Sequence, residues 1–565
     1  MRAIPNGFTT SAPLKLLVPL LLGCAALCAP PRPFAEEDRA QLAGTVRDSV
    51  TGAPCKGMEV LLEPAGGPAN YMTAANANGA FSFTSVESGN YRIALHRQGY
   101  RYLPGNQANL LIHLEPGQKL GGIDLSAVPL GSISGTVIDA EGEPVVEAWV
   151  RVMKPQWRHG RRIWTEVRGL PFEFRHTDDL GRYRIDDLES GEYCVLIGPP
   201  HIDGMIRPTQ DTPGGPEMAA IPVYYPGAVT LAEASRLHVG PGQELTGIDV
   251  QLPSKRTFHI RGPADPKWAD PAAGMLHNSP YVVARYDDGL IKDWAEFRGE
   301  LYQDGSFDIP CVPAGHYRVQ IMGRREPLSD SAAASIQSAD ATGVRLSQAK
   351  FDVKIETSVE GDPADSTPVS ASLEPVDRAG GTLSTWPQHP VTIESVLPGR
   401  YLLRIAFSSG THEGEYAKRV LVDGQEVTTA ELDLRGSTNL EIVLAKGTRE
   451  IFGSVTISSP VPPDLSTVLV PEHLRPGGWT SVYHSNIDQR GAFVFWYVTP
   501  GPYRAFVVSG YDEGLWENRD FLRSVADQGT VVVVPEGGAG ALPIKLGPTV
   551  LSPVEVERAA SRIGN

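Results

Sequence analysis

The clearest pattern in the chain is a short segment in which apolar and polar positions alternate. Its first copy places Phe81 and Phe83 two residues apart, and a few residues later Tyr91 and Ile93 have the same spacing. Successive side chains of a β-strand point to opposite faces, so such pairs share one face. The segment therefore predicts two consecutive strands, each with an apolar face turned toward a core.

The same segment recurs along the chain with constant internal spacing. Its copies start at Gly79, Gly181, Gly305, His389 and Gly491, and the copy at His389 is degenerate because it lacks the first glycine. In every copy a second glycine follows ten residues after the start, and a tyrosine lies two residues beyond that glycine. We expect the first glycine to need a positive φ, and the tyrosine to fill the core with its hydroxyl at the edge.

Each copy of the repeat belongs to one predicted domain, so the chain is expected to be an all-β tandem array of about five β-sandwiches. The first opening strand covers 42–46, and the second covers 133–137. Links between the modules look short, which predicts a semi-rigid array. The predicted divisions are a signal peptide at 1–35, modules at 38–129, 130–253, 254–350, 351–446 and 447–548, and a C-terminal tail at 549–565.

Two modules resemble a known family. Gly44-Thr45-Val46-Arg47-Asp48, then Gly52-Ala53-Pro54 and the strand at 57–62, resemble the carboxypeptidase regulatory-like domain. The segments Gly135-Thr136-Val137-Ile138-Asp139 and Ala148-Trp149-Val150-Arg151-Val152 resemble it too. The resemblance extends to module five and is weaker in modules three and four. The resemblance implies that each module is a transthyretin-like, seven-stranded Greek-key β-sandwich related to starch-binding and collagen-adhesin B-type domains, without implying peptidase activity.

The N-terminus has the pattern of an export signal. Arg2 and Lys15 are the only charges before the apolar stretch at 16–29, which is too short for a membrane span. Leu21-Leu22-Gly23-Cys24 resembles a lipoprotein cleavage box, which would place a lipid on Cys24; the alternative is an ordinary signal cut near Ala35. Either way, the pattern predicts a secreted or cell-envelope protein in the periplasm, the outer membrane or the cell surface.

Composition narrows the function classes. The formal net charge is −16, which disfavours binding to nucleic acid. The 59 glycines and 48 prolines have no strict period and fit many short strands joined by turns. Beyond the signal, Cys55, Cys194 and Cys311 fall in three predicted modules, so we expect no disulfide within a module.

Catalytic and metal-binding patterns are weak. His412-Glu413-Gly414-Glu415 is an isolated match to a metal motif in a Ser/Gly-rich segment, and Gly131–Gly135 has Ile133 where a hydrolase needs its serine. Asp178-Asp179 and Asp186-Asp187 bracket a strand and are expected to form turns rather than a calcium site. We therefore predict a protein without catalytic residues, metal or cofactor.

The best candidate for binding is the basic, aromatic run at 157–164 in module two. Two interpretations are open: the side chains contact a glycan, or the run is a hairpin around His159-Gly160 whose tryptophans pack on the sandwich. Trp496 lies in a repeat strand and is expected to be structural. The candidate ligand-binding residues are Trp157, Arg158, Arg161, Arg162 and Trp164.

Three functions fit these observations. The leading hypothesis is a non-catalytic envelope protein that binds carbohydrate, either a polysaccharide or a glycan, or another surface polymer. The second is a structural spacer or adhesin stalk. The third is an accessory chain that contacts other envelope proteins, such as a separate hydrolase or transporter.

Overall fold

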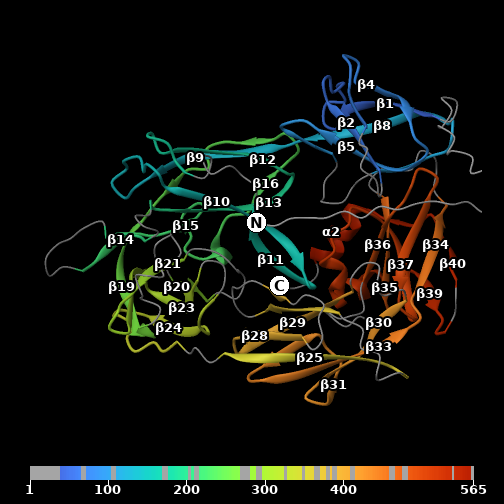
Figure 1. Cartoon of the computed structure of the whole chain (residues 1–565). Helices are drawn as coiled ribbons and strands as arrows, with labels where there is room; N and C mark the ends of the chain where they lie inside the picture. The colour runs from blue at the N-terminus through green and yellow to red at the C-terminus, as the bar shows by residue number, and fades with distance from the viewer. Residues whose placement is uncertain are drawn as a thin grey trace, which may run out of the picture.

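The computed structural model is almost entirely β (Figure 1). It describes residues 39–64, 71–102, 110–167, 176–200, 205–208, 216–266, 280–287, 296–323, 327–346, 350–361, 369–376, 382–384, 391–407, 414–456, 465–473, 482–537 and 540–561. The predicted signal peptide and Cys24 lie outside the described residues. Among the described residues, none belongs to a helix long and apolar enough to cross a membrane.

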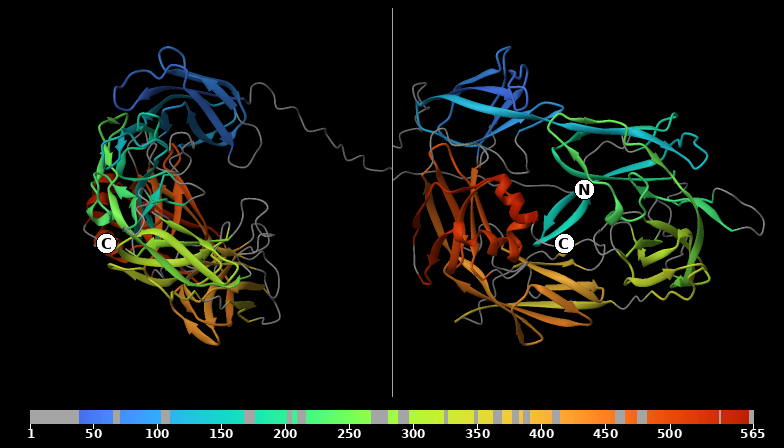
Figure 2. Two further views of the ribbon diagram at one scale, coloured as in Figure 1. Left: turned by 90° about the vertical axis from the view of Figure 1, so that its left-hand side faces the viewer. Right: turned by 180° about the vertical axis from the view of Figure 1, so that it is seen from behind.

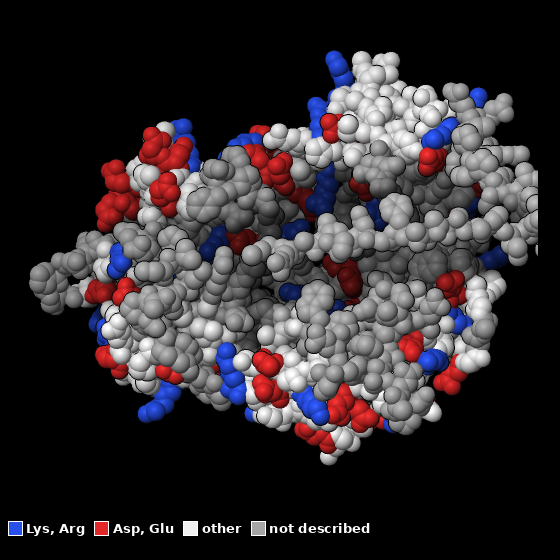
Figure 3. Space-filling model, viewed as in Figure 1, with Lys and Arg blue, Asp and Glu red and all other residues white. Residues whose placement is uncertain are grey.

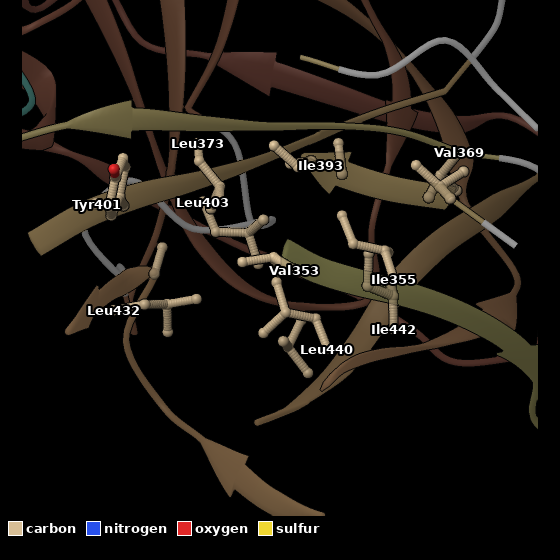
Figure 4. Packing of buried hydrophobic residues seen from close by; sticks show 14 of the residues in the cluster. Val353, Ile355, Val369, Leu373, Ile393, Tyr401, Leu403, Leu432, Leu440 and Ile442 are labelled. Carbon is tan, nitrogen blue, oxygen red and sulfur yellow. The ribbon is translucent and has the colours of Figure 1, made fainter. Parts of the chain in front are cut away.

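Five main clusters of buried apolar side chains follow one another along the chain, and each lies inside one module. The predicted tandem array of β-sandwiches is thus confirmed, because each cluster is enclosed by its own strands. Figure 4 shows this packing in module four, where Val353, Leu373 and Leu440 from three strands point toward one another.

Module one has two four-stranded sheets. Its first strand, β1, pairs with β4 in antiparallel fashion and with β8 in parallel fashion. One sheet holds β1 (Ala40–Asp48), β4 (Ala80–Val86), β6 (Tyr100–Tyr102) and β8 (Lys119–Pro129), and the other holds β2 (Glu59–Pro64), β3 (Tyr71–Ala74), β5 (Gly89–His96) and β7 (Leu110–Leu114).

Modules two and four repeat this plan, with an opening strand between an antiparallel and a parallel neighbour. Module two consists of β9 (Gly131–Ile138), β12 (Arg182–Leu188), β17 (Glu244–Leu245) and β18 (Val250–Gln251) against β10 (Trp149–Arg158), β11 (Arg161–Glu166), β13 (Gly191–Gly198), β15 (Val223–Tyr224) and β16 (Leu237–Val239). Module four consists of β25 (Phe351–Val359), β28 (Val391–Val396), β30 (Glu415–Val422), β31 (Gln425–Val427) and β33 (Thr438–Lys446) against β26 (Ser370–Pro375), β27 (Leu383–Ser384), β29 (Gly399–Ala406) and β32 (Glu431–Leu434).

Module three departs from the plan because β21 pairs with strands of both layers and joins them into one seven-stranded sheet. Its strands, in sheet order, are β14 (Met218–Ala220), β19 (Ser254–Pro263), β22 (Ser306–Pro313), β21 (Phe297–Leu301), β20 (Tyr281–Tyr286), β23 (Gly315–Met322) and β24 (Ala332–Ile336). The strand β14 comes from the range predicted for module two, and Ala219 packs in the core of module three. A single boundary at residue 253 is therefore too simple. The chain enters module three at β14, returns to module two at β15 and enters module three again at β19.

Module five adds helices to the common plan. Its strands are β34 (Arg449–Val455), β37 (Ala492–Val498) and β40 (Leu542–Leu546) against β35 (Leu465–Pro471), β36 (Tyr483–Asn486), β38 (Gly501–Ser509), β39 (Thr530–Val534) and β41 (Val550–Leu551), with helices α1 (Arg519–Val525) and α2 (Pro553–Ser561). The predicted tail at 549–565 instead supplies β41, which pairs with β38, and α2, whose Val556 and Ala559 pack beside Trp516.

The repeated segment has the same geometry in each module. Phe81 and Phe83 are both buried, and the first glycine has a positive φ of 73° at Gly79 and 83° at Gly491. His389, the start of the degenerate copy, lies outside the described residues. In every copy the tyrosine hydroxyl donates to the carbonyl oxygen four residues earlier; these bonds join Tyr91 to Glu87, Tyr193 to Glu189, Tyr317 to Pro313, Tyr401 to Leu397 and Tyr503 to Thr499.

A glycine in the opening strand allows the closing strand to approach closely. A Cβ placed on Gly44 would lie 2.1 Å from the carbonyl oxygen of Ile123, and one on Gly135 would lie 2.1 Å from that of Ile248. The next residue, Thr45, donates from its hydroxyl to Asp124 at 2.6 Å. Module four has Ile355 at the equivalent position, and its parallel pairing runs without a register shift.

The modules do not extend as a line. Leu111 of β7 forms a bridge with Asp488, and Gln489 makes hydrogen bonds with the backbone N–H and carbonyl of His113, so module one contacts module five. Figures 1 and 2 show the five modules following one another around the β10–β11 hairpin, with module one beside module five. The contacts between modules one and five close the array into a ring.

Candidate functional site

The run at 157–164 forms the end of a β-hairpin. Strands β10 and β11 pair in register with Arg158 opposite Arg161, and the two turn residues have positive φ values of 52° at His159 and 72° at Gly160. Two consecutive residues with positive φ are typical of a type I′ turn, whose twist matches that of the strands. The run therefore forms the hairpin around His159-Gly160 that one of the two interpretations predicts.

The tip of the hairpin docks on the turn at 512–518 of module five. The backbone N–H of Gly160 donates to the carbonyl oxygen of Gly514 at 3.0 Å, and the Asn518 side chain donates to the carbonyl of Gly160 at 2.7 Å. A Cβ on Gly160 would lie 2.7 Å from the Glu517 carbonyl, and one on Gly514 would lie 2.1 Å from that of Trp157. Both glycines thus permit a close backbone contact between modules two and five.

Module four holds the same tip through a buried carboxylate. Glu374 of β26 is 6% exposed. Its oxygens lie 2.6 Å from Arg158 Nη2, 3.1 Å from His159 Nε2 and 3.8 Å from Arg404 Nε. One carboxylate of module four therefore neutralises two cationic or protonatable groups of module two and one arginine of its own module.

His159 joins three modules, because its Nδ1 also lies 3.2 Å from Glu517 Oε2 of module five. Burial by itself lowers the pKa of His159, but the hydrogen bonds with Glu374 and Glu517 outweigh burial and raise the pKa, although Arg404 opposes protonation. An imidazolium can donate from both ring nitrogens, which suits a ring placed between two carboxylates.

The five predicted ligand-binding residues have different surroundings. Trp164 is 6% exposed and packs with Trp149, while the Arg236 guanidinium lies 4.3 Å from its ring centre. Trp157 is half-buried and packs against module five. Arg158 contacts Glu374, Arg161 pairs with Glu431, and Arg162 pairs with Glu192. The two tryptophans therefore do not form an exposed pair.

A cavity of about 650 Å³ lies at the junction of modules two, four and five. Three of the predicted ligand-binding residues line it: Trp157, Arg158 and Arg162. Figure 3 shows acidic and basic side chains intermixed along the hollow between the modules. The cavity walls carry both signs of charge, because Lys154 and Arg404 face it together with Glu189, Glu192, Asp512 and Glu517. Burial raises the pKa of Asp512, although backbone N–H groups donating to its carboxylate oppose this.

Sequence reasoning missed the partners of the hairpin. Glu374, Arg404 and Glu517 lie in modules four and five, and nothing near them in the sequence marks them. It also missed Trp496, which was expected to be structural but is 52% exposed. The strand at 492–498 bends at a bulge, so two successive side chains point outward there.

The other residues that the sequence offered as metal ligands or thiols form turns, lie buried in the modules or fall outside the described residues. The carboxylate of Asp178 accepts from the backbone N–H groups of Leu180 and Arg182, which is turn chemistry. Cys55, Cys194 and Cys311 are free and buried in separate modules. His412 and Glu413 lie outside the described residues, and the part of the chain that is described contains no group of three or more His, Cys, Asp or Glu side chains that could hold a metal ion.

Solved structures similar to parts of this chain include three pilin proteins. The minor pilin GBS52 of Streptococcus agalactiae is 12% identical, with 38% of this chain and 96% of its own chain covered and a TM-score of 0.21. Shaft pilin SpaA of Lactobacillus rhamnosus GG is 10% identical, with 39% and 97% covered and a TM-score of 0.19. The major pilin subunit BcpA of Bacillus cereus is 11% identical, with 55% and 100% covered and a TM-score of 0.16.

A search of curated proteins finds no match. The family model of the carboxypeptidase regulatory-like domain matches residues 41–117. This segment contains the opening strand with Gly44, the repeat with Phe81 and Phe83, and the Tyr91 hydroxyl bond. The first β-sandwich is thus similar to the carboxypeptidase regulatory-like domain over residues 41–117.

Proposed function

We propose that the chain is a non-catalytic, secreted or cell-envelope protein that binds carbohydrate in the cavity beside the β10–β11 hairpin. The observation that carries this proposal is the mixed wall of that cavity. Donors from Arg158 and Arg162 face it together with acceptors from Glu189 and Glu192. Sugar hydroxyl groups donate and accept hydrogen bonds at once, so a wall of both kinds fits them, and the volume is in the range of small-molecule sites.

The charge balance favours a neutral glycan. Arg162 and Glu192 lie 2.9 Å apart, and Lys154 and Glu189 lie 3.4 Å apart, so the cationic groups already have anionic partners. A strongly acidic polymer would have to displace those carboxylates. The ring closure also argues against the stalk hypothesis, because a spacer gains length only when its modules follow one another in a line.

A pair of neighbouring arginines provides the test. Arg162 lines the cavity, whereas Arg161 points to Glu431 and does not line it. We expect the full chain to bind glycans on an array and Arg162→Ala to weaken that binding by roughly tenfold, since a hydrogen bond to a charged group contributes about 1.5–3 kcal/mol. Arg161→Ala removes the same charge and should leave binding unchanged. Equal losses in both variants, or no glycan bound by the unmodified chain, would contradict the proposal.

A further inference from the structure

Module five carries an exposed aromatic patch, which consists of Phe452 on β34 and Trp496 and Tyr497 on β37. Their side chains are 45%, 52% and 58% exposed. The rings of Phe452 and Trp496 are in edge-to-face contact, with 6.3 Å between centroids and 73° between planes. The patch is on the outer face of the sheet β37–β34–β40, away from the core of module five and from the hairpin cavity.

The other four modules show that the fold does not require these aromatic residues. Phe452 on the opening strand of module five pairs with Val494 on the repeat strand. The residues at the position of Phe452 in the other modules are Ala43, Ser134, Arg261 and Lys354. The repeat strand ends in a buried aliphatic residue, and in module five Trp496 and Tyr497 come directly before it. The residues at these two positions in the other modules are Thr84-Ser85, Asp186-Asp187, Pro310-Cys311 and Glu394-Ser395. Module five alone has aromatic residues at these positions, so packing within the sandwich does not account for them.

The backbone holds the patch in place. Tyr497 lies at a bulge with a φ of 53°, and Asp187, Cys311 and Ser395 have φ values of 60°, 57° and 60° at the same position. The hydroxyl of Tyr483 donates to the carbonyl oxygen of Tyr497 at 3.3 Å. The positive φ is thus common to four modules and the bulge to all five, and in module five the bulge turns two successive aromatic side chains toward solvent.

The size of the patch favours a small, flat ligand over a protein partner. An aromatic side chain offers about 150–250 Å² when fully exposed, so three half-exposed rings offer roughly 300 Å². A stable protein interface needs about 800 Å² from each partner. The aromatic patch is too small for that on its own, but it is wide enough for a ring stacked on Trp496.

Polar groups border the aromatic rings. Ser454 lies two residues along β34 from Phe452, and Lys545 is its partner on β40; both are exposed. A sugar ring has one face of C–H groups, which the negative face of an aromatic ring attracts, and a rim of hydroxyls that can bond to such polar groups. We propose that the aromatic patch binds the sugar rings of a polysaccharide, as a second site separate from the cavity.

The repeat itself supplies the variant that tests this site. Phe452→Ser, Trp496→Thr and Tyr497→Ser together install residues that occur at the same positions in other modules, so the fold should be retained. Val531→Thr with Val533→Thr is the control, because these side chains are 57% and 63% exposed on β39 of the same module and lie outside the patch. The measurement is co-sedimentation of the full chain with insoluble cellulose, chitin and peptidoglycan.

We expect the unmodified chain and the control to bind at least one of these polymers, and the triple variant to bind it about tenfold more weakly or worse, which corresponds to 1.4 kcal/mol or more. Equal binding by the triple variant would overturn this inference, and so would binding of none of the polymers. A change from dimer to monomer in the triple variant, measured by sedimentation velocity, would assign the patch to self-association instead. Because the cavity is tested with soluble glycans and Arg162→Ala, its failure is distinguishable from failure of the patch.

Discussion

Replacing Glu374 with Gln is expected to release the hairpin tip from module four. The substitution keeps the size of the side chain but removes the charge that faces Arg158, His159 and Arg404. Breaking a buried ion pair by removing one partner costs about 3–5 kcal/mol, and we expect about 3 kcal/mol here because both arginines are partly exposed. The contact between modules two, four and five should therefore open far more often.

Hydrogen exchange at the hairpin tip measures this opening. The N–H of Gly160 is bonded to Gly514 only while the tip is docked, so its exchange should become roughly a hundredfold faster in the Glu374→Gln variant. Glu431→Gln is the matched control, since Glu431 pairs with Arg161 at 3.1 Å but its side chain is 30% exposed. A more exposed pair contributes at most about 1 kcal/mol. Equal exchange in both variants would show that Glu374 does not hold the tip.

Replacing Gly44 with Ala is expected to destabilise module one severely. The new Cβ would lie 2.1 Å from the carbonyl oxygen of Ile123 and 2.8 Å from the Phe81 ring. Since a backbone carbonyl cannot move aside cheaply, strands β1 and β8 must separate, and we expect a cost of about 3 kcal/mol in the free energy of unfolding.

Gly121→Ala is the control for this experiment. Gly121 lies on β8, two residues from Ile123, and a Cβ there would meet no atom within 4 Å. We expect a change within about 0.5 kcal/mol. Hydrogen exchange of the β1 amides, followed by mass spectrometry during urea unfolding of the full chain, reports on module one separately from the rest. Similar stabilities of the two variants would mean that the close approach at Gly44 is not required.

The sandwiches could be predicted because their signals are local. The spacing from Gly79 to Gly89 to Tyr91 fixes two strands and a turn within a few residues, and the same spacing recurs in each module. The hairpin at His159-Gly160 could be found for the same reason, as glycine in a short polar link favours a tight turn. Local patterns thus predicted the elements and most of their apolar faces.

The ring closure could not be predicted, because its contacts join distant residues. His159 and Glu517 are 358 residues apart, and His159 and Glu374 are 215 apart. No periodicity relates such positions, and a charged residue on a strand such as Glu374 looks like any solvent-facing residue. Burial of that carboxylate depends on the docking of another module, which only the folded chain reveals.

Two misjudged segments did contain usable signals. Ser552-Pro553-Val554-Glu555 has the pattern of a helix start, and in the structure Ser552 and Glu555 form a capping box at the N-terminus of α2. Trp496 was expected to be structural, although the repeat has the polar residues Thr84, Asp186 and Glu394 at its position in three other modules. Comparison of the repeats position by position would have marked Trp496 as exposed.

Small-angle X-ray scattering of the full chain tests the closed arrangement most directly. If module one contacts module five and the hairpin tip is docked, the radius of gyration should lie between about 24 and 30 Å, close to that of one compact body of this length. Five modules of about 13 Å each, placed end to end, would instead give a radius of about 50 Å. A value near the larger figure would contradict the ring and the cavity formed at its centre.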